Sequence, residues 1–279
     1  MKKLIGGLVV CLCLGILPAN AQYIDQYVED ERMLYAHTKQ VNQFFRRFNG
    51  EEDANGDRFS VNDTLYRNNY YRKNFLGHLY DKESTQIDPL LKFQFINEVS
   101  SLVEPKYLDF HGGEWVAEVQ AIFLYEGVEQ KCRLFLHLQE EQIGSKWVIN
   151  RIIFEPYVAF FRTTENIPKD EQKFLHPLSH ELDFMNLTKV FREDALLEQF
   201  AERSHHPDHL SVFIYEFRKG MISFKTIEQV KFHFFQIDGW YFELAKFNRK
   251  SLNSGWLISN LLKISEEDRK VLKSFIYQK

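Results

Sequence analysis

Two pairs of histidines have a spacing that could bind a metal ion. His176 and His180 are four residues apart, and so are His205 and His209. On a helix, this spacing would place both imidazoles of a pair on one face, within reach of one ion. A proline lies just inside each pair, however, which is typical of a first helical turn and would leave the first histidine outside the helix. We therefore expect no metal site, and these four histidines are the candidate ligands should one exist.

Asp109 and His111 are the residues best placed for acid–base chemistry. They lie just before Gly112 and Gly113 at the start of a predicted strand, where a loop could present them to a pocket. No nucleophile, base and orienting group can be assembled around them from the sequence. We expect them to form a turn in a non-catalytic protein that needs no cofactor. An isomerase or hydrolase working from a pocket is the alternative.

A mixed aromatic and basic cluster is a candidate contact surface for a ligand or partner. Tyr66, Tyr70, Tyr71 and Arg72 could stack on rings and pair with anionic groups. The alternative is an amphipathic helix whose tyrosine rings serve as packing while their hydroxyls stay in water.

The loop before this cluster carries two short motifs. The segment from Glu51 to Asn62 resembles the opening of a calcium loop, but Glu51 is long for the first ligand and Asn62 stands where a bidentate glutamate is needed. We expect a solvated loop. Asp63-Thr64-Leu65 resembles the Asp-Thr-aliphatic O-glycosylation signal of some Gram-negative bacteria, which makes Thr64 a candidate glycosylation site.

Residues 1–21 have the pattern of a cleavable signal peptide. Lys2 and Lys3 precede an apolar run from Leu4 to Leu17, and Ala19-Asn20-Ala21 is a small-residue cleavage site. The run is shorter than the roughly 20 residues that span a bilayer. We expect a mature chain that starts at Gln22, is periplasmic or secreted, and has no membrane span.

The composition describes an acidic globular protein. With 35 basic and 39 acidic side chains the formal charge is −4, and loss of the two leader lysines brings it to −6. This balance argues against binding to nucleic acid, which favours clustered Lys and Arg. Cys132 would be the one cysteine of the mature chain, because Cys11 and Cys13 lie in the leader, where neither follows the small residue that lipidation requires.

Two parts of the chain align without a gap, in a register that places Trp147 on Trp256. In this repeat register Lys146 to Asn150 falls on Gly255 to Ser259, and Ala121, Phe123 and Tyr125 fall on Val230, Phe232 and Phe234. A shared register matters, because a slip of one residue would exchange the two faces of every strand.

Each half shows helical patterns followed by a meander of strands. Alternating apolar residues predict strands at Glu118 to Tyr125, Cys132 to Gln139, Lys146 to Phe154, Gln229 to Ile237, Trp240 to Phe247 and Trp256 to Ile264. Apolar residues at helical spacing predict helices at Tyr23 to Phe48, Leu90 to Leu102, Leu210 to Met221 and Ser265 to Lys279. The last helix begins with a capping-box pattern, Ser265 three residues before Asp268.

These patterns predict an α+β fold of two tandem modules, each with helices packed on a curved antiparallel sheet. We place the modules at 22–160 and 174–279, joined by a polar linker at 161–173. Trp147 and Trp256 should be largely buried at the start of each module's last strand.

The element order, together with Lys146-Trp147-Val148-Ile149 and Gly255-Trp256-Leu257-Ile258, resembles the nuclear transport factor 2-like (cystatin-like cone) superfamily. That superfamily contains isomerases, dehydratases, transport adaptors and exported pocket proteins, so the resemblance implies a fold and leaves the activity open. We expect an exported two-module protein of the bacterial envelope that binds a small ligand or a protein partner. A structural subunit of an envelope assembly is a further alternative.

Overall fold

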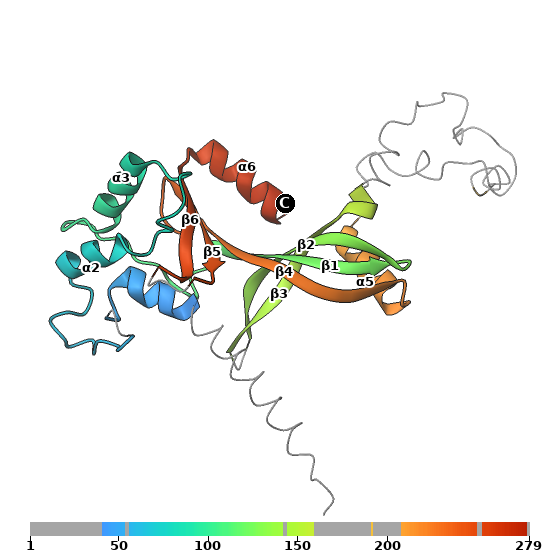
Figure 1. Ribbon diagram of the computed structural model, residues 1–279, viewed down its shortest axis with the longest axis horizontal. Coiled ribbons are helices and arrows are strands. Elements are labelled where there is room, and N and C mark those ends of the chain that lie inside the picture. Colours follow the sequence, from blue (N-terminus) through green and yellow to red (C-terminus); the bar gives the residue numbers. More distant parts are fainter. Residues whose placement is uncertain are drawn as a thin grey trace, which may run out of the picture.

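The computed structural model describes residues 41–53, 56–141, 144–158, 191, 208–249 and 253–277. The predicted signal peptide and the predicted linker lie outside these residues. Within them the protein has an α+β fold, in which helices pack around one twisted antiparallel sheet (Figure 1).

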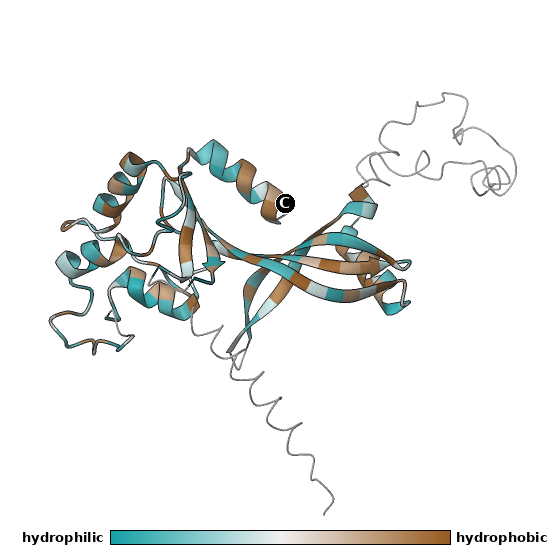
Figure 2. Cartoon of the chain, in the orientation of Figure 1, coloured by the Kyte–Doolittle hydropathy of each residue, from teal (hydrophilic) through white to brown (hydrophobic). Residues whose placement is uncertain are grey.

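All six predicted strands are present, and most are longer than predicted. They are β1 (Trp115–Tyr125), β2 (Val128–Glu141), β3 (Gly144–Phe154), β4 (Ile222–Phe234), β5 (Trp240–Phe247) and β6 (Gly255–Lys263). Hydrophobic and hydrophilic residues alternate along much of their length (Figure 2), as expected for strands with differently exposed faces. The largest difference is at β4, which starts at Ile222 and not at the predicted Gln229.

The two-module arrangement is not confirmed, because the six strands form one continuous sheet in the order β3-β2-β1-β4-β5-β6. β1 and β4 pair antiparallel from Trp115↔Phe234 to Tyr125↔Ile222. Gln120 lies directly opposite Gln229, which is its own equivalent in the repeat register. The repeated sequence pattern therefore falls on two meanders that meet at this pair within one sheet, and not on two separate sheets.

The helices are exchanged between the halves. The helical segment at 41–49, α2 (Asn69–Leu76) and α3 (Pro89–Val99) precede the first meander, yet their apolar residues share a core with β5 and β6. Conversely, α5 (His209–Arg218) precedes the second meander and packs against Phe123, Cys132 and Phe154 of the first. Figure 1 shows the two groups at opposite ends of the sheet. Each group also touches its own half, through Phe45 on Trp115 of β1 and α5 beside Ile222 of β4, so the two cores are shared between the halves.

Aromatic rings make up the larger core. The predicted stripe of Val41, Phe44, Phe45 and Phe48 is buried, as its helical spacing predicts. Phe44 and Phe48 contact Phe242 with ring centroids 6.5 and 6.2 Å apart. These contacts join the first described helix to a strand of the second half of the chain.

Arg72 fastens the helical layer through backbone carbonyls. Its guanidinium is fully buried and donates to Phe48 O and Val99 O, each at 2.7 Å, and to Lys106 O. Phe48 and Val99 lie at the ends of their helices, where carbonyls lack partners and the helix dipole is negative. Burial lowers the pKa of Arg72 to about 10, so the side chain stays charged at neutral pH.

The closing helix α6 (Glu266–Tyr277) covers the opposite face of the sheet. Its start is the predicted capping box: Asp268 N–H donates to Ser265 Oγ and Ser265 N–H to Asp268 Oδ2, both at 3.1 Å. Ile276 is buried with Phe135 and Tyr241, and Phe275 packs edge-on against Phe135 at 6.0 Å. The helix therefore bridges strands of both halves.

Because the halves share a sheet and exchange helices, they should unfold together. Phe242→Ala empties a fully buried site between the two and should lower the free energy of unfolding by roughly 3 to 5 kcal/mol. Urea titrations followed by far-ultraviolet circular dichroism and by tryptophan fluorescence should give coincident transitions. Phe224→Ala, at a ring that is 53% exposed, is the matched control and should cost far less. Two separated transitions would contradict the shared core.

Candidate functional site

The sheet opens where β5 leaves β4. β5 pairs with only the last part of β4, from Lys231↔Ala245 to Phe234↔Phe242. Upstream of Lys231, β4 continues alongside β1, from Ile222 to Val230. Within the described part of the chain, this stretch has no strand on its other side. Its backbone donors and acceptors on that side form an open sheet edge.

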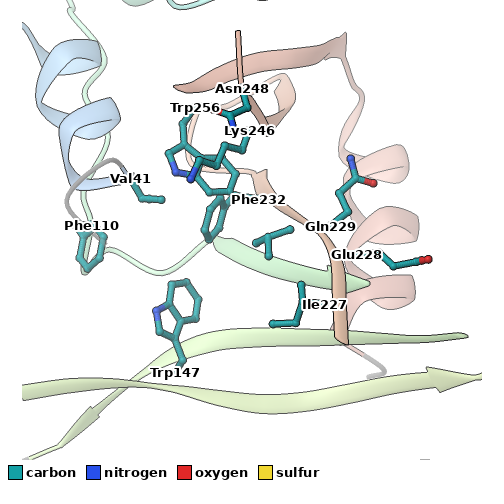
Figure 3. Close-up of a pocket in the computed structure, with 11 residues that line it drawn as sticks. Val41, Phe110, Trp147, Ile227, Glu228, Gln229, Phe232, Lys246, Asn248 and Trp256 are labelled. Carbon is teal, nitrogen blue, oxygen red and sulfur yellow. The ribbon is translucent and has the colours of Figure 1, made fainter. Parts of the chain in front are cut away.

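An apolar groove of about 640 Å³ lies against this open edge. Phe232 and Ile227 of β4 line it together with Trp147 of β3 and Trp256 of β6, and Val41 closes one side (Figure 3). The strands of both halves therefore contribute to one site. Phe232 occupies the centre, with its ring centroid 4.8 Å from that of Trp256 and 6.1 Å from that of Trp147.

The prediction of a largely buried Trp147 is wrong. Its side chain is 38% exposed, because the pairing of β1 with β2 ends at Ala117↔Leu136 and the β2–β3 hairpin projects away from β1. The Trp147 indole packs edge-on against Trp115 at 5.2 Å. Trp256 is partly buried, and its indole N–H has no hydrogen-bond partner within the described residues. Both side chains line the groove.

Polar groups at the groove come from β4 and the end of β5. Glu228 and Gln229 are exposed on β4, and Lys246 and Asn248 lie across from them. Burial lowers the pKa of Lys246. With one acid and one amine among mainly apolar groups, the groove offers a binding surface of mixed charge and no nucleophile–base pair.

A buried polar network crosses the other face of the sheet. His233 Nε2 lies 3.0 Å from Glu118 Oε2, and His233 Nδ1 lies 2.7 Å from the hydroxyl of Tyr241, which donates to Glu243 at 2.8 Å. Glu118 and His233 are both less than a tenth exposed. These groups link β1, β4 and β5 and face the core under α6. The network therefore stabilises the sheet that the two halves share.

The structure separates Asp109 and His111 from the groove. Asp109 is exposed and accepts a hydrogen bond from the His111 backbone N–H at 2.9 Å, which is the turn that the sequence predicts. His111 Nδ1 lies 3.2 Å from the Ser145 hydroxyl at the mouth of a second cavity. The two side chains do not form an acid–base pair.

The aromatic and basic cluster is divided by burial. Tyr70 and Tyr71 are 76% and 49% exposed and contact each other edge-on. Tyr66 is half-buried with its hydroxyl 3.5 Å from Glu51. Arg72 is buried and its donors are used within the fold, so it is not part of any exposed surface.

The remaining candidates are placed as follows. Thr64 is exposed in a turn, as a modification site requires. The calcium-like segment does not present its carboxylates to a loop centre: Glu52 is buried and pairs with Arg46 and Arg47. Within the described residues, no three His, Cys, Asp or Glu side chains are grouped to hold a metal ion. The four candidate ligands, His176, His180, His205 and His209, include only one in the described residues, His209 at the start of α5.

Sequence reasoning missed most of the groove. Ile227 lies outside the predicted strand at Gln229 to Ile237, and the register alone gives no reason to place Phe232 at an opening. The alternation of Ile222, Phe224 and Thr226 was the available signal for a longer strand. Cys132 is buried, and burial raises its pKa to about 12, which disfavours the reactive thiolate.

Comparison with known proteins finds no matching family model, no matching curated protein and no matching solved structure. Among the helices that the structure describes, none is long and apolar enough to cross a membrane. The site therefore has to be interpreted from its own geometry.

The Glu118–His233 contact predicts a pH-dependent stability. Burial opposes ionisation of Glu118, but the hydrogen bond and charge of His233, with a hydrogen bond from Gln120, outweigh it and hold its pKa below the usual 4.5. Ionised Glu118 thus stabilises the fold above that usual pKa, and this contribution is lost as the pH falls through the lower pKa of the folded state.

We expect the free energy of unfolding, measured in urea between about pH 6 and pH 3, to fall less steeply in Glu118→Gln than in the wild type. Glu267→Gln, at an exposed carboxylate of α6, is the control and should follow the wild type. Equal slopes for Glu118→Gln and the wild type would contradict the assignment.

Proposed function

We propose that this chain is an exported, non-catalytic binding protein of the bacterial envelope, whose groove holds an extended apolar segment of a partner protein. The observation that supports this most strongly is the open edge of β4 beside an apolar groove. An exposed strand edge presents a row of backbone donors and acceptors, and an extended polypeptide is the partner that can pair with it regularly.

The groove suits the side chains of such a segment. Alternate residues of an added strand point to one face of the sheet, and on that face they would meet Phe232, Trp147 and Trp256. Residues pointing the other way would lie near water. Glu228 and Lys246 have opposite charges, which would favour a segment that carries both acidic and basic residues.

The second part of the proposal concerns the origin of the fold. The two meanders would be copies of one cone-like module of the nuclear transport factor 2-like kind, merged through β1 and β4. The order of helices before a meander in each half and the register about Gln120 and Gln229 support this. In a merged sheet the groove lies between the two copies and not inside one cone. A groove between copies suits a binding role better than a catalytic role.

Export is proposed from the leader pattern. Mass spectrometry of the protein isolated from the envelope of its native cells should give a mature chain that begins at Gln22. A chain that retains Met1, or one that carries lipid on a cysteine, would contradict export by this route.

The groove is tested by selecting random twelve-residue peptides on the wild-type protein. Selected peptides should have alternating apolar residues. N-methylation of every second backbone nitrogen of the peptide should abolish binding, because it removes the peptide N–H groups that donate to the carbonyls of the β4 edge. Trp147→Ala should weaken binding by about tenfold or more, the usual loss on truncating an aromatic anchor. Tyr70→Ala is the control, at an exposed aromatic outside the groove. Peptides that tolerate both N-methylation and Trp147→Ala would contradict strand addition here.

A further inference from the structure

A second cavity, of about 700 Å³, lies where β2 separates from β1. The two strands pair only as far as Ala117↔Leu136, while β2 stays paired with β3 as far as Glu141↔Gly144. The cavity is bounded by Trp115 on one strand and His137 on the other, and α6 supplies its third wall. In Figure 1, α6 lies over the part of the sheet where this separation begins.

Two buried polar atoms of this cavity lack partners. Neither His137 Nδ1 nor Asn150 Oδ1 makes a hydrogen bond within the described part of the chain, and both side chains line the cavity. A buried polar atom without a hydrogen bond destabilises a fold. Five other atoms in the described residues share this status, but these two belong to side chains that line the same cavity. A ligand with hydrogen-bonding groups at this cavity would supply the missing partners.

Asn150 is directed to its place by a β-bulge. Phe135 pairs with Arg151 and Leu136 with Ile149, which leaves Asn150 as the extra residue of β3. Bulges redirect side chains and are frequent beside functional sites. Regular strand pairing is thus interrupted at Asn150, whose side-chain oxygen has no partner within the described residues.

The internal repeat provides a comparison within the same chain. In the repeat register the equivalent of Asn150 is Ser259, which is likewise the extra residue of a bulge, between Glu243↔Asn260 and Leu244↔Ile258. There the Ser259 hydroxyl donates to the Glu243 carbonyl at 3.3 Å. A bulge at this position therefore does not require an unpartnered side chain. The unpartnered oxygen of Asn150 needs an explanation other than the bulge.

The charges around the cavity are balanced. Glu114 is bound by Arg269 at 3.1 Å and by Lys273, and these two cations outweigh burial and hold the pKa of Glu114 below its usual value. Arg269 lies outside the lining, whose charged residues are Glu114 and Glu140 against Lys270 and Lys273, two of each sign. A lining with no excess charge favours a neutral ligand over an ion.

We infer that this cavity is a binding site for a neutral, hydroxyl-rich molecule of the sugar class. A hydroxyl group both donates and accepts, so one hydroxyl can donate to Asn150 Oδ1 while a neighbouring one bonds to His137 Nδ1. Ser145 and His111 at the mouth offer further polar contacts, and Leu138 and Tyr277 offer apolar surface to the carbon skeleton. The volume falls in the range of small-molecule sites.

The test uses methyl glycosides of glucose, galactose, mannose and N-acetylglucosamine, added to the full-length protein at up to about 50 mM, which detects dissociation constants in the millimolar range. At least one glycoside should shift the imidazole nitrogen signals of His137 in the ¹⁵N-labelled protein. No shift with any of the four would overturn the proposal.

Asn150→Ser, which installs the residue of the equivalent bulge, is the decisive variant. It should weaken glycoside binding by roughly tenfold, the loss expected when a hydrogen bond is removed, and leave the urea midpoint of the unliganded protein unchanged or higher. Gln139→Ala, at an exposed residue of the same hairpin, should change neither. Unchanged affinity, or a lower midpoint without glycoside, would assign Asn150 a structural role and overturn the proposal. Trp256→Ala should retain glycoside binding, which separates this site from the peptide groove.

Discussion

The antiparallel pairing of β1 with β4 is the interaction on which the rest of the molecule depends. It runs the full length of β1, from Trp115↔Phe234 to Tyr125↔Ile222. The outer strands leave this central pair at adjacent positions: β5 is unpaired from β4 upstream of Lys231, which lies opposite Glu118, and β2 is unpaired from β1 beyond Leu136, which lies opposite Ala117. The groove and the cavity lie where these outer strands separate from the central pair.

The same pairing explains why the helices are exchanged. With β1 and β4 joined, each meander extends toward the opposite end of the sheet, and the nearest uncovered apolar face for the N-terminal helices belongs to β5 and β6. Arg72 stabilises that layer by neutralising two helix ends at once. The cost of burying it is offset by hydrogen bonds from a charged donor, which are stronger than those between neutral groups. A cation in the core thus acts as a packing device for helices and not as a ligand group.

The sequence predicts the parts of this fold that depend on local alternation and little of what depends on long-range pairing. Strand faces, the aromatic stripe that includes Phe45, and the capping box at Ser265 follow from spacing alone. Which strand edges meet does not, because alternation specifies the faces of a strand and not its neighbours. The exposed Trp147 and the groove both result from edge pairing, which is why spacing does not reveal them. The prediction of Arg72 as a surface group is wrong because its partners are backbone carbonyls, which leave no trace in the side-chain pattern.

The one sheet has two openings, and the residues at equivalent positions of the sequence repeat differ between them. The repeat register places Lys246 at the position of His137 and Ser259 at that of Asn150, while both halves have tryptophan at the positions of 147 and 256. In the second half the bulge residue is satisfied internally, and the opening is apolar. In the first half Asn150 Oδ1 has no partner within the described residues, and more of the residues that line the opening are polar or charged. The two bulges leave out one residue each in the same way but carry different side chains. Because the Ser259 hydroxyl finds a partner at its bulge, the bulge itself does not require the unpartnered oxygen of Asn150.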